Sequence, residues 1–536
     1  MAGTVREATF DVLRDLGLTT LYANPGSTEV PFLAGLPGDL RFVLALHEAS
    51  VVGMATGEAL ARDRPALVNL HTVAGLGNAV GALATARQNR APLVVVVGSQ
   101  DRRHLAMEPF LAGRLDDLAG SYPVWVGQPA RPQDVPGAIA RAFHESQGPR
   151  RGPALVIVPM DDWLAPWDGS ETIPAPGELV RAAGADAGAV AMVAERIDQA
   201  ARVAMVTGAG ADGAARWAAV TALAERLGCP VWQEPFGARA GFPQDHPRFA
   251  GHLPAARGRL RETLAGYDLV VVAGAPVLRQ YPYEPGPLVP EGTGVIQLTE
   301  DPAEAARAPA ALAVVTPLAP FVTELAGRVR AREAEGPARA TPAPPAPDPA
   351  RALRPDDVFT LLAARLPADA VVVEESPSSR FRLEALVPAR APLGFLSAAG
   401  GGLGFAMPAA IGVRMAEPGR PVVCVVGDGS SLYAIQSLWS AARYGAGVLF
   451  LVMANGGYAI MDRLAEAHDP AAKPPWPSFG EVDIATLAAG FGCPARRVAG
   501  AADLTAALDE VVPGLATRAE PLVLVVEVEP DPTFTP

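Results

Sequence analysis

The sequence predicts an α/β protein with three domains, each built on a parallel β-sheet covered by helices. Its 536 residues are too many for one hydrophobic core, and a prior of about 150 residues per domain suggests roughly three. Short β-branched runs alternate with helical stretches along the chain, as in parallel α/β sheets. Proline-rich stretches interrupt this alternation twice and indicate where domains are joined.

Each expected domain has its own strands. In the first we expect strands at residues 20–22, 41–44, 66–69 and 93–97, with 155–158 closing the sheet. The second contains strands at 201–206 and 269–272, and the third has strands near Val371, Phe395, Val422, Val448 and Leu522. Residues 163–188 are typical of a linker, and the run rich in proline and alanine before Arg354 is the clearest tether. We therefore place the domains at 1–180, 188–330 and 354–536, with a linker at 331–353.

The composition narrows the class of protein. A formal net charge of −13 argues against a nucleic-acid-binding surface. The three cysteines are scattered without metal-ligand spacing, which is consistent with a reducing cytoplasm. The N-terminal residues lack the apolar core of a secretion signal, and apolar runs of about six residues are far below the roughly 18 that span a bilayer. We expect a cytoplasmic protein with no nucleic-acid or membrane partner.

Two polar motifs follow neighbouring strands in the third domain. Gly427-Asp428-Gly429 ends the apolar run 421–426, and Asn455-Gly456-Gly457-Tyr458 follows the run 448–453. A helix expected over 431–444 makes the strands parallel, so both motifs emerge at one sheet edge. A carboxylate and an amide oxygen suit Mg²⁺, and glycines beside a helix N-terminus at Ser430 suit phosphate. The pair predicts a metal-bridged diphosphate site, although a lone GDG motif is more often only a turn into a helix.

Three strand ends in the first domain carry reactive side chains. Asn24-Pro25-Gly26-Ser27 follows the first strand, Glu48 follows the second, and His71 follows the third. A hydroxyl, a carboxylate and an imidazole therefore face one crevice. Each has an ordinary explanation: a turn for Ser27, the helix dipole for Glu48, and a structural role for His71. Their coincidence favours a functional site.

The chain resembles the benzoylformate decarboxylase family of thiamine diphosphate enzymes. The resemblance rests on the runs 24–32, 46–53, 69–72, 274–277 and 398–405 and on the Asp428 and Asn455 motifs, and it covers nearly the whole chain in order. It implies pyrimidine-binding, middle and diphosphate-binding domains. It also implies thiamine diphosphate and Mg²⁺ as cofactors, with Ca²⁺ as a substitute ion. Dimers or tetramers with active sites between subunits follow from the same resemblance.

The resemblance also implies roles for individual residues. Glu48 would activate the aminopyrimidine ring, Ser27 would orient the substrate carboxylate, and His71 would exchange protons. Leu403 would wedge beneath the cofactor and hold it bent. Asp428, Asn455 and the carbonyl of Gly457 would bind the metal, although Ala454 stands where relatives often have another Asn. The remaining cofactor contacts implied are Asn24, Pro25, Gly26, Ser378, Gly401, Gly429, Ser430, Gly456 and Tyr458.

The chain departs from the family pattern at two further places. Tyr281 stands where the family has a second histidine, and a phenol ordinarily ionises near pH 10, which makes it a poor proton shuttle. His252 is a nearby substitute in the sequence. Ile460, Met461 and Leu464 occupy the expected substrate pocket, so specificity for a phenyl group does not follow, and core packing explains each of them equally well.

We predict decarboxylation of an aromatic or bulky 2-keto acid to an aldehyde and CO₂. A thiamine diphosphate carboligase, or an enzyme like acetolactate synthase, is the nearest alternative, although the matching segment of the latter lacks a histidine. A catalytically silent homologue is a second alternative, disfavoured by Glu48, Asp428 and Asn455. The motif Gly208-Ala-Gly210-Ala-Asp-Gly213, followed by Glu234, also matches a dinucleotide fingerprint and would alone suggest an NAD-dependent dehydrogenase. Because middle domains of this family share that topology, we favour an inherited fold over a nucleotide site.

Overall fold

The computed structural model describes residues 3–170, 173–181, 184–333, 351–470 and 474–530. The chain forms two compact units. The first contains Met1–Val180, Gly402–Val498 and Gly514–Val526, and the second contains Arg181–Gly401, Ala499–Pro513 and Glu527–Pro536. The described residues form three six-stranded sheets, which confirms the predicted α/β fold class. Within the described residues, no helix is both long and apolar enough to span a membrane.

The first sheet has the strand order β3-β2-β4-β5-β7-β6, and all of its pairs are parallel. Its strands are β2 (Thr20–Asn24), β3 (Arg41–Leu44), β4 (Ala66–Leu70), β5 (Leu93–Ser99), β6 (Trp125–Gly127) and β7 (Pro153–Pro159). Our expectation that residues 155–158 close the sheet is wrong, because β6 pairs with the outer side of β7. A partly exposed strand of three residues gives no alternation signal that the sequence could reveal.

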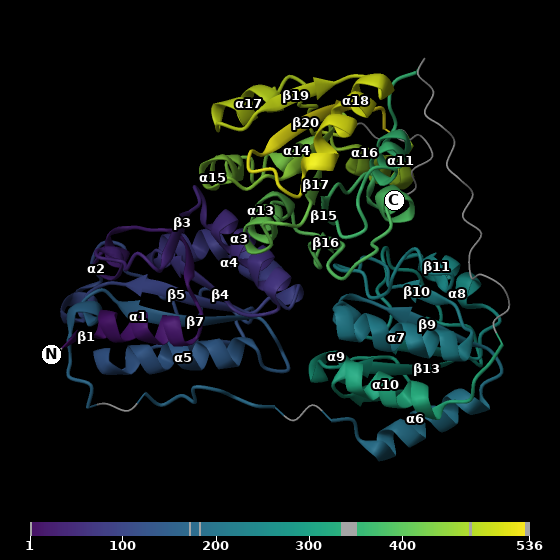
Figure 1. Ribbon diagram of the computed structural model, residues 1–536, viewed down its shortest axis with the longest axis horizontal. Helices are drawn as coiled ribbons and strands as arrows, with labels where there is room; N and C mark the ends of the chain where they lie inside the picture. The colour runs from purple at the N-terminus through teal and green to yellow at the C-terminus, as the bar shows by residue number, and fades with distance from the viewer. Residues whose placement is uncertain (1–2, 171–172, 182–183, 334–350, 471–473, 531–536) are drawn as a thin grey trace. The chain divides into compact units, whose positions relative to one another are not determined.

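Helices cover both faces of this sheet. Figure 1 shows α1 (Val5–Asp15) and α5 (Val135–Ser146) on one face, and α3 (Glu48–Arg62) and α4 (Thr72–Gln88) on the other. The core beneath α1 and α5 includes Phe32 stacked on Trp163, with ring centroids 4.3 Å apart. The segment expected as a linker begins with structure, because β8 (Pro166–Trp167) pairs with β1 (Gly3–Thr4). This double-sided cover leaves the carboxyl ends of the strands for polar groups.

The second sheet has the order β11-β10-β9-β12-β13-β14 and is also parallel. Its strands are β9 (Val203–Thr207), β10 (Val231–Gln233), β11 (Phe249–His252), β12 (Leu269–Ala273), β13 (Gly294–Thr299) and β14 (Leu312–Val315). One core packs this sheet against α6 (Ala187–Gln199), α7 (Ala214–Leu227) and α10 (Leu318–Arg328). A second core includes α8 (Arg257–Leu264), and α9 (Pro302–Ala306) follows β13. Most of the expected linker, residues 334–350, lies outside the described residues.

The third sheet has the order β16-β15-β17-β18-β20-β19. Its strands are β15 (Val371–Glu375), β16 (Phe395–Ser397), β17 (Val422–Gly427), β18 (Leu449–Ala454), β19 (Ala495–Val498) and β20 (Leu522–Glu527). Its helices are α11 (Pro355–Ala363), α12 (Arg380–Leu386), α13 (Ala406–Ala416), α14 (Asp428–Ser431), α15 (Ser437–Tyr444), α16 (Ala459–His468), α17 (Ile484–Gly490) and α18 (Ala501–Val511). The single helix predicted over 431–444 is wrong. The chain forms α14 and α15 with a tighter turn between them, in which Tyr433 and Ala434 donate to carbonyls three residues earlier.

Helices α3 and α13 pack closely within the first unit. A Cβ atom added at Gly57 would lie 2.1 Å from the carbonyl oxygen of Ala409, and one at Gly412 would lie 1.9 Å from that of Met54. The Ser50 and Ser437 hydroxyls are 2.9 Å apart, and the Tyr444 hydroxyl receives the Leu44 N–H at 2.7 Å. Small residues therefore allow these backbones to approach.

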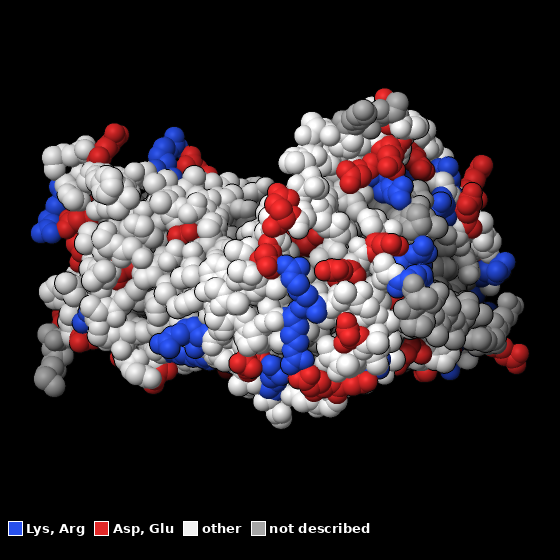
Figure 2. Space-filling view, turned by 90° about the horizontal axis from the view of Figure 1, so that it is seen from above, with Lys and Arg blue, Asp and Glu red and all other residues white. Residues whose placement is uncertain are grey.

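Figure 2 shows acidic and basic side chains interspersed over one face of the molecule.

Candidate active site

The Glu48 carboxylate lies at the carboxyl edge of the first sheet, where the sequence predicts it. Glu48 begins α3 and is largely buried, with 8% of its surface exposed. Its Oε1 atom accepts a hydrogen bond from Asn24 Nδ2 at 3.1 Å, and its Oε2 atom accepts one from Asn78 Nδ2 at 3.1 Å. Two neutral amides thus orient the carboxylate without neutralising it. Asn78 is a residue that the sequence did not single out.

His71 lies at the same sheet edge and is held by a buried carboxylate. Its Nδ1 atom is 2.8 Å from Oε2 of Glu29 and 3.1 Å from the Thr28 hydroxyl. Glu29 is only 2% exposed and also accepts hydrogen bonds from the Thr28 hydroxyl and the Gly26 N–H. These contacts hold the ring through Nδ1, so that Nε2 is the ring nitrogen that neither Glu29 nor Thr28 contacts. His71 is therefore fixed in orientation, with one nitrogen available for chemistry.

The sequence did not identify Glu29 or Thr28, although both lie in the run 24–32. A signal was available, because Glu29 follows a Pro-Gly turn at the end of a buried strand, where a carboxylate needs partners. The Gly26 position is tight: a Cβ atom there would lie 2.4 Å from the His71 ring. Ser27 is exposed and is the first residue of the 3₁₀ turn Ser27–Glu29. The turn thus holds Ser27 in the same short segment as Glu29, the residue that contacts His71.

The Asp428 and Asn455 motifs meet at the carboxyl edge of the third sheet, as predicted. The Asp428 carboxylate accepts hydrogen bonds from the N–H groups of Gly429, Asn455 and Gly456 at 2.8, 2.9 and 2.6 Å. Burial raises the pKa of Asp428, and these N–H groups oppose that rise. The Asn455 Oδ1 atom accepts from the Gly457 N–H at 3.1 Å.

The oxygens at this edge fit a hard divalent cation. They comprise one carboxylate, one side-chain amide and the main-chain carbonyl of Gly457, the donor types that Mg²⁺ prefers. A bound cation would also offset the cost of burying the Asp428 charge. Among the described residues there is no cluster of three or more His, Cys, Asp or Glu side chains that could hold a metal instead.

Aromatic rings shape the surroundings of this edge. Tyr458 packs against Phe479 with ring centroids 4.9 Å apart, and a Cβ atom at Gly429 would lie 2.8 Å from both rings. The glycine is therefore required by packing. Ser430 is buried beside it, while Leu403 is half-buried at the start of the segment that leads into α13. The three expected pocket residues, Ile460, Met461 and Leu464, lie on α16, a helix with no buried residue.

Tyr281, Ser378 and Gly401 belong to the second unit, whereas Glu48, His71 and Asp428 belong to the first. Tyr281 is 55% exposed, and its ring lies edge-on to Phe236 with centroids 6.5 Å apart. Ser378 follows β15, and Gly401 has a positive φ of 71°. His252, the other imidazole considered in place of the second histidine, packs edge-on against Phe249 at 5.7 Å.

Family models match the chain in three places. The N-terminal thiamine pyrophosphate-binding domain of thiamine pyrophosphate enzymes matches residues 3–119, the central domain matches 190–325, and the C-terminal thiamine pyrophosphate-binding domain matches 379–526. The chain belongs to the thiamine pyrophosphate enzyme family. This membership confirms the resemblance that the sequence suggested, and it assigns thiamine diphosphate as the cofactor.

Similar members of this family include decarboxylases. Benzoylformate decarboxylase of Pseudomonas aeruginosa is 39% identical over 510 residues, which cover 94% of this chain and 96% of that protein. A protein of Mycobacterium tuberculosis assigned as an acetolactate synthase large subunit is 33% identical over 92% of this chain and 93% of its own length. The structure of the thiamine diphosphate-dependent 4-hydroxybenzoylformate decarboxylase of Rhodococcus jostii RHA1 matches with a TM-score of 0.92 and 36% identity, covering 99% and 100% of the two chains.

The glycine-rich motif of the central family domain is packed by the chain itself. The Gly210 N–H donates to the Gly274 carbonyl at 2.8 Å, and a Cβ atom at Gly208 would lie 2.3 Å from Oε1 of Glu234. Helix α7 begins only after Gly213. Glu234 also lies 3.7 Å from the Arg279 guanidinium, which competes for the carboxylate that a ribose would need. Contacts within the protein therefore explain why glycine stands at positions 208 and 210, and a bound nucleotide is not needed to explain it.

Proposed function

We propose that this protein is a thiamine diphosphate-dependent decarboxylase of an aromatic or bulky 2-keto acid. The observation that carries this proposal is the His71 imidazole fixed by Glu29 at the sheet edge that also holds Glu48. A carboxylate and an oriented imidazole at one edge provide a partner for the cofactor ring and a proton carrier for the substrate. The 39% identity to a benzoylformate decarboxylase supports the same reaction.

When bound, thiamine diphosphate supplies a nucleophilic carbon and an electron sink for the loss of CO₂. Glu48, held in place by Asn24 and Asn78, would share a hydrogen bond and a proton with the ring nitrogen of the aminopyrimidine. Ser27 would orient the substrate carboxylate, and the second ring nitrogen of His71 would exchange a proton with the bound substrate. Leu403 would pack against the bound cofactor. The other residues we assign to the cofactor are Pro25, Gly26, Ser378, Gly401, Gly429, Ser430, Gly456 and Tyr458.

We assign Mg²⁺ to Asp428, Asn455 and the Gly457 carbonyl, with Ca²⁺ as a substitute. Three domains at 1–180, 188–330 and 354–536, joined by 331–353, would bind the pyrimidine, form the middle and bind the diphosphate. We further infer that the protein forms dimers or tetramers with each active site between subunits. We also infer that it is located in the cytoplasm. Ile460, Met461 and Leu464 would then line the substrate pocket, since none of them is buried in the single chain.

A second candidate function, carboligation, is favoured by Tyr281. A phenol at the position of the family's second proton carrier slows protonation and product release, which leaves time for an aldehyde to add. The product would then be a hydroxyketone. The same active site serves both reactions, so product identity separates them.

The test is CO₂ release from a panel of 2-keto acids, benzoylformate included, with thiamine diphosphate and Mg²⁺ present and the organic products identified. We expect rapid release with an aldehyde as the main product. A hydroxyketone as the main product would favour carboligation. Absence of turnover across the panel, in protein shown to bind the cofactor, would contradict the proposal.

A further inference from the structure

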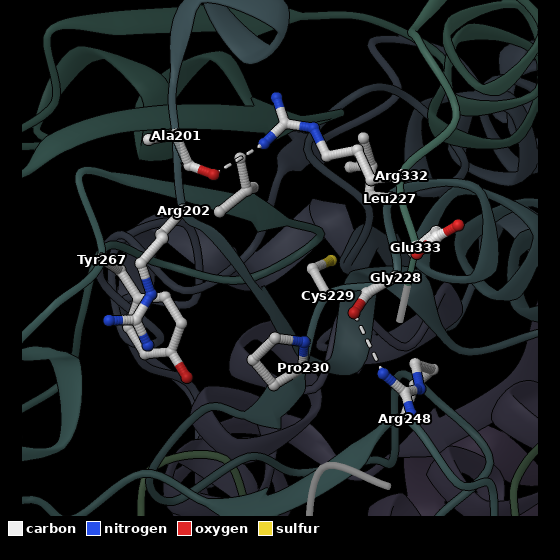
Figure 3. Close-up of a pocket in the computed structure, with 11 residues that line it drawn as sticks. Ala201, Arg202, Leu227, Gly228, Cys229, Pro230, Arg248, Tyr267, Arg332 and Glu333 are labelled. Carbon is white, nitrogen blue, oxygen red and sulfur yellow. Dashed lines mark hydrogen bonds between the residues drawn. The ribbon is translucent and has the colours of Figure 1, made fainter. Parts of the chain in front are cut away.

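The second unit contains a cavity of about 310 Å³ at the amino edge of its sheet (Figure 3). Its lining residues Arg202, Pro230 and Tyr267 come just before β9, β10 and β12. The glycine-rich motif lies at the other end of β9, about 16 Å away at roughly 3.3 Å per strand residue. The cavity is therefore separate from the edge where ligands of such folds ordinarily bind.

The cavity is strongly basic in an acidic protein. Arg202, Arg248 and Arg332 lie on three sides of Cys229 (Figure 3). Glu333 is the one acidic residue in the lining, so the lining has a formal charge of +2, whereas the chain has −13. None of the three guanidinium groups forms an ion pair with a carboxylate of the described residues. The nearby Asp268 carboxylate accepts the Ala201 and Arg202 N–H groups and interacts with Arg332, but three arginines against Glu333 and Asp268 still leave net positive charge, which attracts anions.

Two of these arginines cap helices, but capping uses only some of their N–H donors. Arg248, which is 9% exposed, donates from Nη1 to the Gly228 carbonyl at 3.0 Å, beyond the end of α7. Arg332 donates to the carbonyls of Ala201, at 3.2 Å, and Ile197. A guanidinium has five N–H donors, so each retains several for a ligand. Arg202 has no capping role, since its guanidinium lies 5.5 Å over the Tyr267 ring.

The remaining walls suit the carbon skeleton of a small molecule. Leu227, Pro230 and Tyr267 supply apolar surface around the buried Cys229. Burial raises the pKa of the Cys229 thiol to about 12, so it adds no negative charge at neutral pH. The cavity volume falls at the lower end of the roughly 300–1,000 Å³ that small-molecule sites have. It is about ten times the volume that one water molecule occupies in the liquid. A molecule with several carbon atoms fits better than a single inorganic ion.

We propose that this cavity binds a small organic anion with two separated acidic groups, through Arg202, Arg248 and Arg332. Guanidinium groups pair with carboxylate and phosphate in the same two-pronged geometry, so the acidic groups can be of either kind. Their placement on three sides favours a ligand that reaches two of them at once. The site lies outside the residues assigned to the decarboxylation reaction and does not depend on that reaction.

The test is titration calorimetry of the holoenzyme with succinate and with inorganic phosphate, each against potassium chloride at equal ionic strength. We expect succinate to bind, and to bind more tightly than phosphate. Arg202→Met should weaken succinate binding at least tenfold, because it removes one charge and no helix cap. Arg259→Met is the matched control, since Arg259 is exposed on α8 outside the cavity and should leave binding unchanged.

Arg248→Met provides a second variant and also removes a helix cap. We expect it to lower the thermal midpoint without ligand and to abolish the stabilisation by succinate. Phosphate binding as tightly as succinate would overturn the requirement for two acidic groups. Succinate heats no larger than those of chloride, or full-strength binding by Arg202→Met, would overturn the site. Because no turnover is measured, these results are independent of the proposed activity.

Discussion

The Nδ1 atom of His71 lies 2.8 Å from Oε2 of Glu29, a carboxylate with only 2% of its surface exposed. The two residues are 42 positions apart and meet because β2 and β4 are neighbours in the first sheet. This contact turns a strand-end histidine into an oriented one.

Glu29→Gln should lower kcat by roughly 10²-fold, the lower limit of what a positioned proton carrier contributes, with little change in KM. Glutamine keeps the size of the side chain, but its amide can no longer accept from Gly26, Thr28 and His71 together. Steady-state kinetics with the preferred 2-keto acid would measure the effect. Glu145→Gln, the same substitution at a partly exposed position on α5, is the control, and a pure KM effect in Glu29→Gln would argue against a role in proton transfer.

Glu48→Gln should slow hydrogen–deuterium exchange at the reactive carbon of bound thiamine diphosphate by about 10³-fold while the protein stays folded. The neutral amide cannot exchange an acidic proton with the ring nitrogen of the aminopyrimidine as a carboxyl group does. Exchange is followed by NMR after acid quench. Glu58→Gln, the same substitution later in α3, should exchange at the normal rate. Equal rates in the two variants would contradict the assignment.

Asp428→Asn should weaken Mg²⁺ binding in the presence of thiamine diphosphate by at least about 100-fold. The reason is that Asp428 supplies the formal negative charge among the three proposed ligand groups. Calorimetric titration of Mg²⁺ into metal-free protein measures this directly. Asp483→Asn, at the partly exposed N-cap of α17, should bind Mg²⁺ normally, and unchanged affinity in Asp428→Asn would place the metal elsewhere.

Gly57→Ala should lower the free energy of unfolding by about 1–3 kcal/mol, because its Cβ atom would lie 2.1 Å from the Ala409 carbonyl oxygen in the α3–α13 contact. Gly81→Ala is a matched control on α4, where a Cβ atom meets nothing within 4 Å. That variant should gain about 0.5–1 kcal/mol from helix propensity. Urea unfolding of both compares them, and equal stability would mean that the helices separate readily.

Cys229 and Cys493 should resist alkylation by iodoacetamide at pH 8 in the folded protein. Burial raises the pKa of both thiols from 9.0 to about 12, so the reactive thiolate is about 10⁻⁴ of each at this pH, against about 0.1 in the unfolded chain. The stability from keeping these thiols neutral is present below pH 9 and is lost as the pH rises towards 12. Peptide mass spectrometry after labelling, with and without urea, reports each site. Equal labelling in both conditions would contradict the burial.

The sequence by itself determined the fold class and the strand-end groups. The runs before Asn24, His71, Asp428 and Asn455 are apolar and short. Within each sheet, parallel strands bring their carboxyl ends to one edge. Such patterns depend on residues close in sequence, so they can be recognised from the sequence alone. Helix boundaries are harder to predict from the sequence, because the break between α14 and α15 depends on turn hydrogen bonds that have no clear sequence signature.

Tertiary structure alone decided which side chains meet. Nothing local marks Asn78 as a donor to Glu48, or Glu29 as the partner of His71, because each pair joins separate segments through strand order and turn geometry. The place of β6 outside β7 and the close approach of Gly57 to Ala409 are of the same kind. So is the cavity of Arg202, Arg248 and Arg332. Secondary structure follows from neighbouring residues, whereas the orientation of a buried charge is fixed by contacts that exist only after the chain has folded.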